Sequence, residues 1–439
     1  MSAKTERRVG IVGAGMAGLM AAHHLTRAGR PVIVFEARDA IGGRIKTILP
    51  GTLTSAKDVA VRPIELGAEF VHGAAQPTLS LAETAGVSLE RVADAHSLYA
   101  GGKFRDMGNV WGRLARVLAT AKDEPDESVA DFLKRRAGDE SDVALLRSMV
   151  EGFDAAPLDD ASLRSIADEA REANDDSAQF RPASGYGVLA ERLLAMIDPS
   201  LLRLHLDTVV EEVEWKPGGD CTLRVSENGG SQTVQTKHCV VTVPIGVLNA
   251  PADSGAASIR FSPKLASLEH PLSLLAMGHV VKVVLSFRHA AWMAHLPKTE
   301  FFHFADAPFP TFWHEPHGAG RLITAWAGGP KAKLLDLLGP RDLLDQISTT
   351  LAECCGVAPV EIREALIRVY QYDFSADPFA MGAYPYARPG GADAWTELAE
   401  PIENALFFAG DATCERHFGT VAGALASGAR AARQILALP

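Results

Sequence analysis

A glycine-rich turn near the start of the chain constrains the fold more than any other stretch. It is Gly13-x-Gly15-x-x-Gly18, preceded by a strand pattern at residues 9–12 and followed by an amphipathic helix pattern at residues 16–28. In such a unit the first glycine allows a tight turn, the second lets a pyrophosphate approach the backbone, and the third lets helix and strand pack closely. The phosphate then lies at the positive end of the helix. The pattern predicts a dinucleotide-binding α/β unit.

The residues after this unit support the same site. A second strand pattern, residues 31–35, ends at Glu36, where a carboxylate would accept a ribose 2′-hydroxyl and repel a 2′-phosphate. The following stretch, ARDAIGGRIKT, offers two more glycines and Arg44, a cation for a pyrophosphate. The sequence holds no second strand-linked G-x-G-x-x-G. We therefore expect one dinucleotide, either a nicotinamide that reacts directly or FAD that the substrate itself reduces.

The C-terminal segment favours FAD without deciding the matter. The stretch LFFAGDAT reads as a strand followed by Asp411, which is suited to the hydroxyls of a ribityl chain. Thr420 then begins a helix rich in alanine and glycine, whose positive end would face a flavin pyrimidine ring. An ordinary close-packed helix of small residues would explain the second feature equally well.

Composition narrows the class of protein. The 439 residues are enough for two or three domains, and a net charge of −11 argues against nucleic acid as a partner. Five cysteines without a C-x-x-C pair indicate a reducing compartment and no structural zinc or other metal site. No run of about 18 apolar residues exists. We expect a soluble, cytoplasmic protein without a membrane anchor.

The middle of the chain is organised in blocks. Helical patterns dominate residues 76–199, strand patterns return in residues 201–243, and a mixed block covers residues 259–386. From residue 123 to residue 176 there are 17 acidic and 6 basic residues. Most of those carboxylates suit a solvated helical surface. The strand-rich half that carries the glycine turn is therefore interrupted twice.

A lysine stands in the middle of an apolar strand pattern, HVVKVVLSF at residues 279–287. Lys282 shares one face of this strand with two valines, and a buried unpaired ammonium is costly. One explanation is a side chain that reaches solvent from an edge strand. The other is a functional lysine that faces a site.

Six stretches distributed over the chain together resemble the flavin-containing amine oxidases, which include monoamine oxidases, polyamine oxidases and flavin-dependent histone lysine demethylases. They are GIVGAGMAGL with VIVFEARDAIGGR, ELGAEFVHG, VVTVPIGVL, MGHVVKVVLSF, DPFAMGAYPY, and LFFAGDAT with GTVAGALASG. The versions GAEFVHG and GTVAGALASG are most similar to polyamine oxidases and the demethylases.

The resemblance implies an α/β fold: a discontinuous, Rossmann-like FAD domain of the glutathione-reductase type and a mixed α+β substrate domain with a helical subdomain. We assign residues 1–75, 205–255 and 385–439 to the FAD domain, and 76–204 and 256–384 to the substrate domain. It also implies a set of FAD contacts. They are Gly13, Gly15, Gly18, Glu36, Arg38, Gly43, Arg44, Gly67, Ala68, Glu69, Val210, Asp411, Thr420 and Val421.

For catalysis, the resemblance implies that Lys282 faces flavin N5 through a water and that Tyr384 stands against the flavin face. This sequence departs from the family pattern at three positions. Ala383 replaces the cysteine that binds FAD covalently in monoamine oxidases, so FAD should be non-covalent. Thr420 takes the place of a second cage tyrosine, and Phe374 replaces a tryptophan usual before the Asp-Pro pair.

The substrate cavity is less well defined by sequence. His72 matches a histidine near the substrate channel of polyamine oxidases, and a functional role there and a structural hydrogen-bonding role are equally open. Aromatic residues of the second mixed block are candidates for the cavity wall or for the core: Phe302, Phe312, Trp313, His314 and Trp326. No particular acidic residue can be assigned to the distal ammonium of a polyamine.

The chemistry implied is oxidation of a small polyamine or monoamine, with hydride passing from the α-carbon to flavin N5. The imine is hydrolysed to a carbonyl compound, and dioxygen reoxidises the flavin to give hydrogen peroxide. An L-amino-acid oxidase and a flavin-dependent desaturase of the same fold remain alternatives, and a non-catalytic FAD-stabilised interaction protein is a remote one. The state of assembly, monomer or homodimer, stays open.

Overall fold

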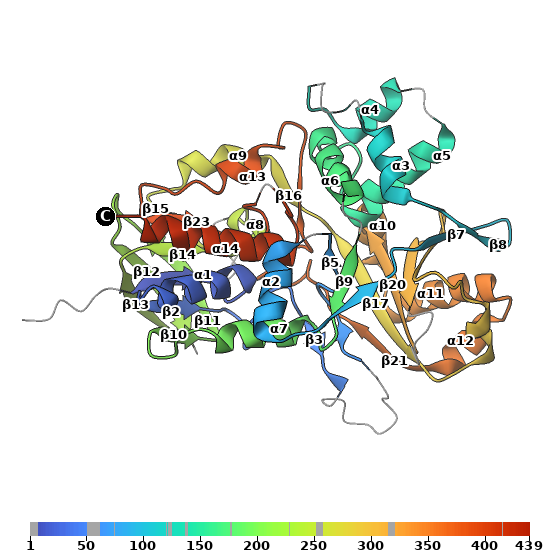
Figure 1. The fold of residues 1–439 in the computed structure, drawn as a ribbon, viewed down its shortest axis with the longest axis horizontal. Helices are drawn as coiled ribbons and strands as arrows, with labels where there is room; N and C mark the ends of the chain where they lie inside the picture. The colour runs from blue at the N-terminus through green and yellow to red at the C-terminus, as the bar shows by residue number, and fades with distance from the viewer. Residues whose placement is uncertain are drawn as a thin grey trace, which may run out of the picture.

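The computed structural model describes residues 8–50, 62–73, 75–119, 121, 125–136, 139–175, 178–227, 229–251, 258–314, 321–414 and 416–439. Two sheets dominate it (Figure 1). A parallel sheet with its helices occupies the side of the molecule that holds the C-terminus, and a long, mostly antiparallel sheet with its helices occupies the other side. The chain passes between these two sides several times, so segments from all parts of the sequence meet between them.

A five-stranded parallel sheet forms the nucleotide side. Its order is β10 (Leu202–His205), β2 (Val32–Phe35), β1 (Val9–Val12), β14 (Cys239–Val241) and β23 (Leu406–Phe408). Alternate residues of β1 pack into two separate cores, Val9 and Ile11 into one and Val12 into the other. Both faces of the sheet are therefore covered, as apolar parallel strands require. The strands predicted from the turn sequence are confirmed.

Four helices cover one face of this sheet: α1 (Met16–Arg27), α14 (Val421–Leu436), α2 (Gln76–Ala85) and α7 (Tyr186–Ala195). Helices α1 and α14 touch closely, because a Cβ on Gly428 would lie 2.2 Å from the carbonyl oxygen of Ala17. The other face is covered by a four-stranded sheet in the order β13 (Gly230–Thr236), β12 (Cys221–Glu227), β11 (Thr208–Glu214) and β15 (Arg260–Ser262). The predicted helix at residues 16–28 is confirmed and ends at Arg27.

The substrate side is built on a seven-stranded sheet. Its order is β21 (Leu366–Gln371), β17 (Val280–Phe287), β20 (Leu322–Gly328), β19 (Thr311–His314), β18 (Phe301–His303), β7 (His96–Ala100) and β8 (Lys103–Asp106). Helices α10 (Gly329–Leu335), α11 (Pro340–Cys355) and α12 (Pro359–Ala365) pack on one face. Strand β17, which carries Lys282, lies inside the edge strand β21 and is paired on both sides.

A helical block lies above this sheet in Figure 1. It contains α3 (Val110–Val117), α4 (Val129–Arg135), α5 (Glu140–Arg147), the π-helical turn η3 (Ser148–Phe153) and α6 (Leu163–Asp175). The expectation that helices dominate residues 76–199 is only partly right. Strands β6 (Leu89–Val92), β7, β8 and β9 (Gln179–Pro182) also lie there. Strands β7 and β8 form a local hairpin around Gly101 and Gly102. The pairing of β7 with β18 and of β9 with β5 (Val71–His72) joins segments far apart in the chain, and no local pattern identifies it.

Shorter elements complete the described part of the chain. They are β3 (Thr47–Ile48), β4 (Ile64–Glu65), α8 (Ile245–Leu248), η4 (Ala266–Leu268), α9 (Glu269–Ser273), β16 (Leu275–Met277), η5 (Ala291–His295), β22 (Pro385–Ala387) and α13 (Ala394–Glu397). The assignment of two domains stays a proposal. Strand β10 starts three residues before the second predicted FAD segment, and the boundary at residue 255 lies outside the described residues.

Candidate active site

A cavity of about 780 Å³ lies between the two main sheets. It brings together nearly all the residues that the sequence singled out. They are Gly13, Gly15, Glu36, Arg38, Gly43, Arg44, Gly67, Ala68, Glu69, His72, Val210, Lys282, Trp313, Trp326, Phe374, Tyr384, Asp411, Thr420 and Val421. Among the predicted FAD contacts, Gly18 is the exception. A Cβ there would lie 2.0 Å from the carbonyl oxygen of Gly13, so this glycine serves helix–strand packing and does not line the cavity.

The turn between β1 and α1 forms a cradle for an anion. Gly15 is the N-cap of α1 and supplies no side-chain cap, so the first backbone N–H groups of the helix remain available. The backbone of Gly43 approaches from the opposite side, where an added Cβ would lie 3.4 Å from Gly15 Cα. Gly13 adopts a φ of 103°, which other residues rarely reach. A pyrophosphate fits this cradle because no side chain intrudes.

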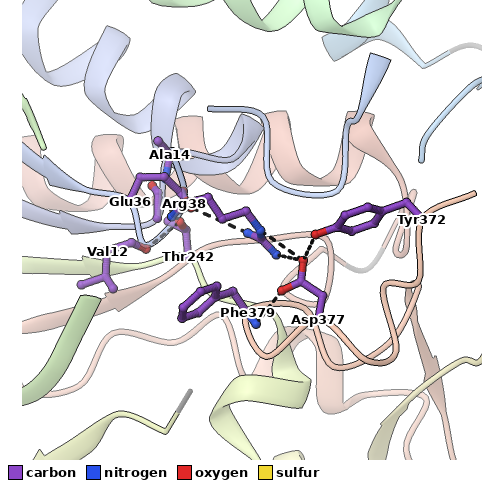
Figure 2. A network of polar contacts seen from close by, with 9 residues as sticks. Val12, Ala14, Glu36, Arg38, Thr242, Tyr372, Asp377 and Phe379 are labelled. Atoms are coloured by element: carbon purple, nitrogen blue, oxygen red, sulfur yellow. Dashed lines mark hydrogen bonds and ion pairs between the residues drawn. The ribbon is translucent and has the colours of Figure 1, made fainter. Parts of the chain in front are cut away.

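Glu36 is fixed beside the cradle by a network of polar contacts (Figure 2). Its Oε2 accepts a hydrogen bond of 2.7 Å from the Ala14 N–H, and its Oε1 accepts one of 3.1 Å from the Arg38 N–H. Burial raises the pKa of Glu36, and these two bonds oppose the shift. The Arg38 guanidinium donates to Asp377 at 2.8 Å, and the Tyr372 hydroxyl donates to the same oxygen at 2.7 Å. Nothing in the sequence indicated that Asp377 holds Arg38.

The remaining nucleotide-side residues pair with one another. Arg44 Nη2 donates to Asp411 Oδ1 at 2.5 Å, and its Nη1 donates to the carbonyl oxygen of Ala383 at 3.0 Å. Thr420 is the N-cap of α14, as predicted, because its hydroxyl accepts a 3.1 Å hydrogen bond from the Gly423 N–H. The chain therefore presents a fixed ion pair and the beginning of a second helix to the same cavity.

Lys282 is buried, with 5% of its surface exposed. Its ammonium donates to the carbonyl oxygen of Gly67 at 3.1 Å and to Glu69 Oε2 at 2.8 Å. It lies 5.5 Å from the centre of the Trp313 ring, within the range of a cation–π contact. The alternative of a lysine that reaches solvent from an edge strand is wrong. An ammonium has three N–H donors, so one remains beyond these two hydrogen bonds.

Glu69 connects Lys282 to further charged and polar groups. Its Oε1 accepts a 3.1 Å hydrogen bond from the Trp313 indole and lies 3.5 Å from the Arg181 guanidinium. Arg181 in turn forms a 2.6 Å ion pair with Glu300. Burial alone would raise the pKa of Glu69, but Lys282 and Arg181 hold that pKa below its ordinary value. The negative charge of Glu69 therefore offsets the cost of burying the Lys282 ammonium.

Aromatic rings form the wall next to Lys282. The rings of Tyr384 and Trp326 are nearly parallel, with centres 6.5 Å apart and an interplanar angle of 9°. The backbone of η3 fixes both, since the Trp326 indole donates to the Gly152 carbonyl at 2.8 Å and the Tyr384 hydroxyl donates to the Phe153 carbonyl. This wall is apolar on its faces and polar only at its edges.

The other aromatic candidates divide by the face of the sheet on which they lie. Phe302 and Phe312 are stacked in the core beneath the sheet and do not line the cavity, and neither does His314. Phe374 lines it and packs against Tyr372, with ring centres 4.7 Å apart.

His72 lies in the cavity wall between Phe70 and Phe153. Its ring centre is 5.5 Å from that of Phe153, at nearly a right angle. Burial lowers the pKa of His72 to about 4, so the imidazole is neutral at physiological pH. A neutral imidazole suits hydrogen bonding to a ligand in the cavity and leaves the apolar wall without a second cation.

Two carboxyl groups that the sequence did not single out also line the cavity. Asp154 follows η3 directly, and Glu169 lies on α6. Burial raises the pKa of Asp154 well above its ordinary value and that of Glu169 to about 7, with each carboxyl influencing the other. They belong to the segment with 17 acidic residues, where sequence offers no means of telling a buried carboxyl from an exposed one.

The comparison with known families decides the assignment of the chain. Residues 16–436 match the family model described as flavin containing amine oxidoreductase. The chain belongs to this family. The match begins directly after Gly15, at the first residue of α1, and includes the strand that carries Lys282.

Relatives of this amine oxidoreductase match almost all of the chain. It is 26% identical to polyamine oxidase 1 of Oryza sativa subsp. japonica, over 98% of this chain and 97% of that protein. It is 27% identical to lysine-specific histone demethylase 2 of Homo sapiens, over 97% of this chain and 53% of that protein. The chain thus spans about half the length of the demethylases it matches.

Solved structures of similar fold include putrescine oxidase bound to putrescine, with a TM-score of 0.79 at 19% identity over 99% of both chains. Cyclohexylamine oxidase from Brevibacterium oxydans matches with a TM-score of 0.80 at 19% identity over 98% of both chains. At this identity the likeness shows the fold alone. It agrees with an α/β FAD-binding domain joined to a mixed substrate domain.

The cofactor of this amine oxidoreductase is a flavin. The glycine cradle, the fixed carboxylate of Glu36 and the uncapped start of α1 fit a dinucleotide. No cysteine is among the described residues that line the cavity, which agrees with non-covalent binding. In the described ranges no group of three or more His, Cys, Asp or Glu side chains is placed to hold a metal ion, and no helix is long and apolar enough to cross a membrane.

The Lys282–Glu69 pair gives a stability prediction. In a Glu69→Leu variant, Lys282 loses its carboxylate in a buried position, and we expect a loss of about 3 kcal/mol in the free energy of unfolding. The double variant Glu69→Leu/Lys282→Met removes both charges and should recover most of that loss. Denaturant unfolding of the two FAD-loaded proteins measures the difference. Glu364→Leu, an exposed carboxylate on α12, is the matched control. Additive losses in the double variant would contradict the pairing.

Proposed function

We propose that this chain oxidises the carbon next to the nitrogen of a primary or secondary amine. The imine product would be hydrolysed to a carbonyl compound, and dioxygen would leave as hydrogen peroxide. The observation that carries the proposal is the placement of buried Lys282 in one cavity with the Tyr384–Trp326 wall and the dinucleotide cradle. When bound, FAD supplies the two-electron acceptor for the amine and the donor for dioxygen.

The residues that would hold FAD follow from the geometry. Glu36 would accept the ribose hydroxyl, and the N–H groups at the start of α1 would hold the pyrophosphate. Asp411, fixed by Arg44, would receive the ribityl hydroxyls. The start of α14 at Thr420 would face the pyrimidine ring, where its partial positive charge favours negative charge.

The aromatic wall favours the neutral form of the substrate amine. An alkyl ammonium has a pKa of about 10 in water, and while protonated its nitrogen has no free lone pair to drive loss of hydride. The faces of Tyr384 and Trp326 offer an apolar surface that disfavours the charged form and so lowers that pKa. The wall therefore supplies the neutral amine and needs no dedicated base beside the reacting nitrogen.

Lys282 supplies a fixed positive charge. Glu69 and the Gly67 carbonyl hold its nitrogen. The remaining N–H would be available to a water beside a bound flavin. A cation held in a buried site stabilises negative charge that develops as dioxygen is reduced. Lys282 is thus the group that we assign to the oxidative half of the reaction.

The arginines of the cavity are already paired with carboxylates of the chain, which favours amine oxidation over amino-acid oxidation. An amino-acid substrate needs a cation for its carboxylate. The arginines among the described lining residues are Arg38, Arg44 and Arg416, and each forms an ion pair with a carboxylate of the chain. A desaturase would not require a lysine at the position of Lys282. A non-catalytic protein would not require the aromatic wall of the cavity.

Anaerobic mixing of the yellow protein with a panel of amines tests the function. We expect bleaching of the flavin band by polyamines or by alkyl and aryl-alkyl monoamines, and none by L-amino acids. Reoxidation in air should then yield hydrogen peroxide in a one-to-one ratio with the carbonyl product. Bleaching by L-amino acids alone would replace the proposal by the amino-acid oxidase alternative, and inertness to every amine would refute it.

The expected cellular location belongs to this proposal. None of the five cysteines, all of them described residues, forms a disulfide, which agrees with a reducing cytoplasm. The partners we propose are a small amine and dioxygen, with neither nucleic acid nor a membrane involved.

A further inference from the structure

A chain of hydrogen bonds connects four side chains at the cavity wall. The Thr311 hydroxyl oxygen is 3.2 Å from His303 Nδ1, and His303 Nε2 is 2.9 Å from His96 Nδ1. His96 Nε2 is then 2.8 Å from Asp94 Oδ1. Thr311, His303 and His96 line the cavity, whereas Asp94 does not. The chain therefore leads from the cavity to a carboxyl behind its wall.

The groups around Asp94 give the first of these hydrogen bonds its direction. Asp94 also accepts hydrogen bonds of 2.9 Å from the Trp111 indole and of 3.0 Å from the Gln179 amide nitrogen, and both of these groups can only donate. A carboxyl that receives two such donors is stabilised as the carboxylate. His96 Nε2 therefore carries a proton and donates to Asp94.

The directions of the other hydrogen bonds follow from this first one. In a neutral imidazole one nitrogen donates and the other accepts. With both rings neutral, His96 Nδ1 accepts from His303 Nε2, and His303 Nδ1 accepts from the Thr311 hydroxyl. Burial lowers the pKa of His303 to about 3, so this imidazole passes a proton on and does not keep it. Every donor of the chain thus points away from the cavity and toward Asp94.

The cavity end of the chain lies beside the aromatic wall. Thr311 is directly opposite Trp326 in the pairing of β19 with β20, and Trp326 is directly opposite Lys282 in the pairing of β20 with β17. Residues directly opposite on antiparallel strands share one face of the sheet, with Cβ atoms about 5 Å apart. The Thr311 hydroxyl is therefore one strand away from a ring of the wall.

The proposed oxidation produces a proton that has to leave this place. The amine arrives mainly as an ammonium and must lose one proton before hydride can leave. The faces of Tyr384 and Trp326 disfavour the charged form, but neither face takes up a proton. The carboxylate of Asp94 can take one up, and its side chain is 13% exposed, so it can pass that proton to solvent.

We propose that the chain from Thr311 to Asp94 is a proton relay that removes the ammonium proton of the substrate amine. The proposal rests on the proposed amine oxidation. The ammonium N–H bond breaks as its proton passes to the Thr311 oxygen, directly or through a water, while the Thr311 proton moves to His303 Nδ1. The proton on His303 Nε2 moves to His96 Nδ1, and the proton on His96 Nε2 moves to Asp94.

The outcome of this transfer is a neutral amine in the cavity and a protonated Asp94, with no charged imidazole between them. Asp94 then releases the proton to solvent. Dioxygen takes up protons when it becomes hydrogen peroxide, and a proton that returns along the same chain restores the original tautomers of His96 and His303. Over one turnover the relay is therefore unchanged.

The titratable groups near the relay leave Asp94 able to accept a proton. His72 of β5 is within electrostatic reach of Asp94 and is neutral at physiological pH, because burial lowers its pKa to about 4. Arg181 of β9 forms its 2.6 Å ion pair with Glu300. Among the described residues, no lysine or arginine forms an ion pair with Asp94. Protonation of Asp94 therefore breaks no salt bridge to a lysine or an arginine.

The test is anaerobic stopped-flow mixing of FAD-loaded enzyme with butylamine and with 1,4-diaminobutane. Enzyme in weak buffer is mixed with amine in strong buffer at about pH 7.5 or at about pH 10.5, where roughly half of the amino groups are already neutral. At the lower pH, His303→Gln and Thr311→Val should each slow bleaching of the flavin by about 10²-fold. At the higher pH both rates should approach that of wild type, because the amine enters without its extra proton.

The two substitutions interrupt the relay in different ways. Glutamine can donate and accept as His303 does, but its nitrogen and oxygen cannot exchange these roles, and valine removes the Thr311 hydroxyl. Thr311→Ser restores a hydroxyl and should recover most of the rate. The double variant His303→Gln/Thr311→Val should be no slower than either single variant, since one broken step already interrupts the relay. His289→Gln changes an exposed histidine away from the cavity and is the matched control.

The outcomes separate the relay from the oxidation. Wild-type rates in both single variants at the lower pH would refute the relay and leave the oxidation intact. Losses that persist at the higher pH, or that add up in the double variant, would show a purely structural role and would also refute the relay. Wild-type enzyme that neither amine bleaches, while the rest of the amine panel is equally inert, would refute the oxidation and the relay together.

Discussion

The Lys282→Met enzyme should keep its FAD and lose most of its reaction with dioxygen. We expect reoxidation of the reduced flavin to slow by about 10²-fold, the usual effect of removing one preorganised charge from a buried site. The amine-dependent reduction should change less, because the aromatic wall stays in place. Stopped-flow mixing of the reduced enzyme with oxygenated buffer measures the first rate, and anaerobic mixing with amine measures the second.

Two further variants test whether the positive charge of Lys282 is the cause of the slower reoxidation. Lys282→Arg retains a cation next to Glu69 and should recover part of the lost rate, whereas a merely structural lysine would show no such recovery. Lys333→Met removes an exposed lysine from α10 and should leave both half-reactions unchanged. Reoxidation of Lys282→Met at the wild-type rate would remove Lys282 from the mechanism.

The second large effect should come from Gly15→Val. A valine side chain at this position enters the gap between Gly15 and Gly43, where the pyrophosphate is expected. We expect the variant to purify without its yellow colour and not to be stabilised by added FAD. For the wild type, free FAD at 1,000 times its Kd contributes about 4 kcal/mol to the free energy of unfolding. Absorbance and thermal unfolding with and without FAD measure both.

Gly230→Val is the matched control for this substitution. Gly230 is exposed on strand β13, away from the cavity, and carries the same change from glycine to valine. It should purify yellow and respond to FAD as the wild type does. A Gly15→Val protein with full FAD content would show that the cradle does not hold the pyrophosphate.

The acidic segment illustrates where prediction from sequence stopped. Asp154 and Asp168 are both acidic residues of the same segment, yet Asp154 is buried in the cavity wall and Asp168 is exposed. Burial of a carboxyl depends on what packs over it, here η3 and the loop of Tyr384, and not on its neighbours in sequence. The function of such a residue can be inferred only when the groups packed around it are known.

The partners in the buried ion pairs could not be predicted from sequence for the same reason. Glu69 was expected among the FAD contacts, and the structure shows that it also holds Lys282, a residue 213 positions away. Arg38 and its partner Asp377 are separated by 339 positions. Nothing in the local sequence of either partner selects the other, because the pairing exists only once two sheets from different parts of the chain face each other.

The sequence alone determined the dinucleotide unit, the strand that carries Lys282 and the N-cap of the last helix. Each of these depends on backbone conformation and side-chain periodicity within about 30 residues, which glycine positions and apolar spacing specify directly. Only the tertiary structure decided which charges meet in the cavity, which aromatic rings line it and that β7 and β8 extend the large sheet. Those outcomes follow from packing between distant segments, and the energy of a buried charge depends on that packing.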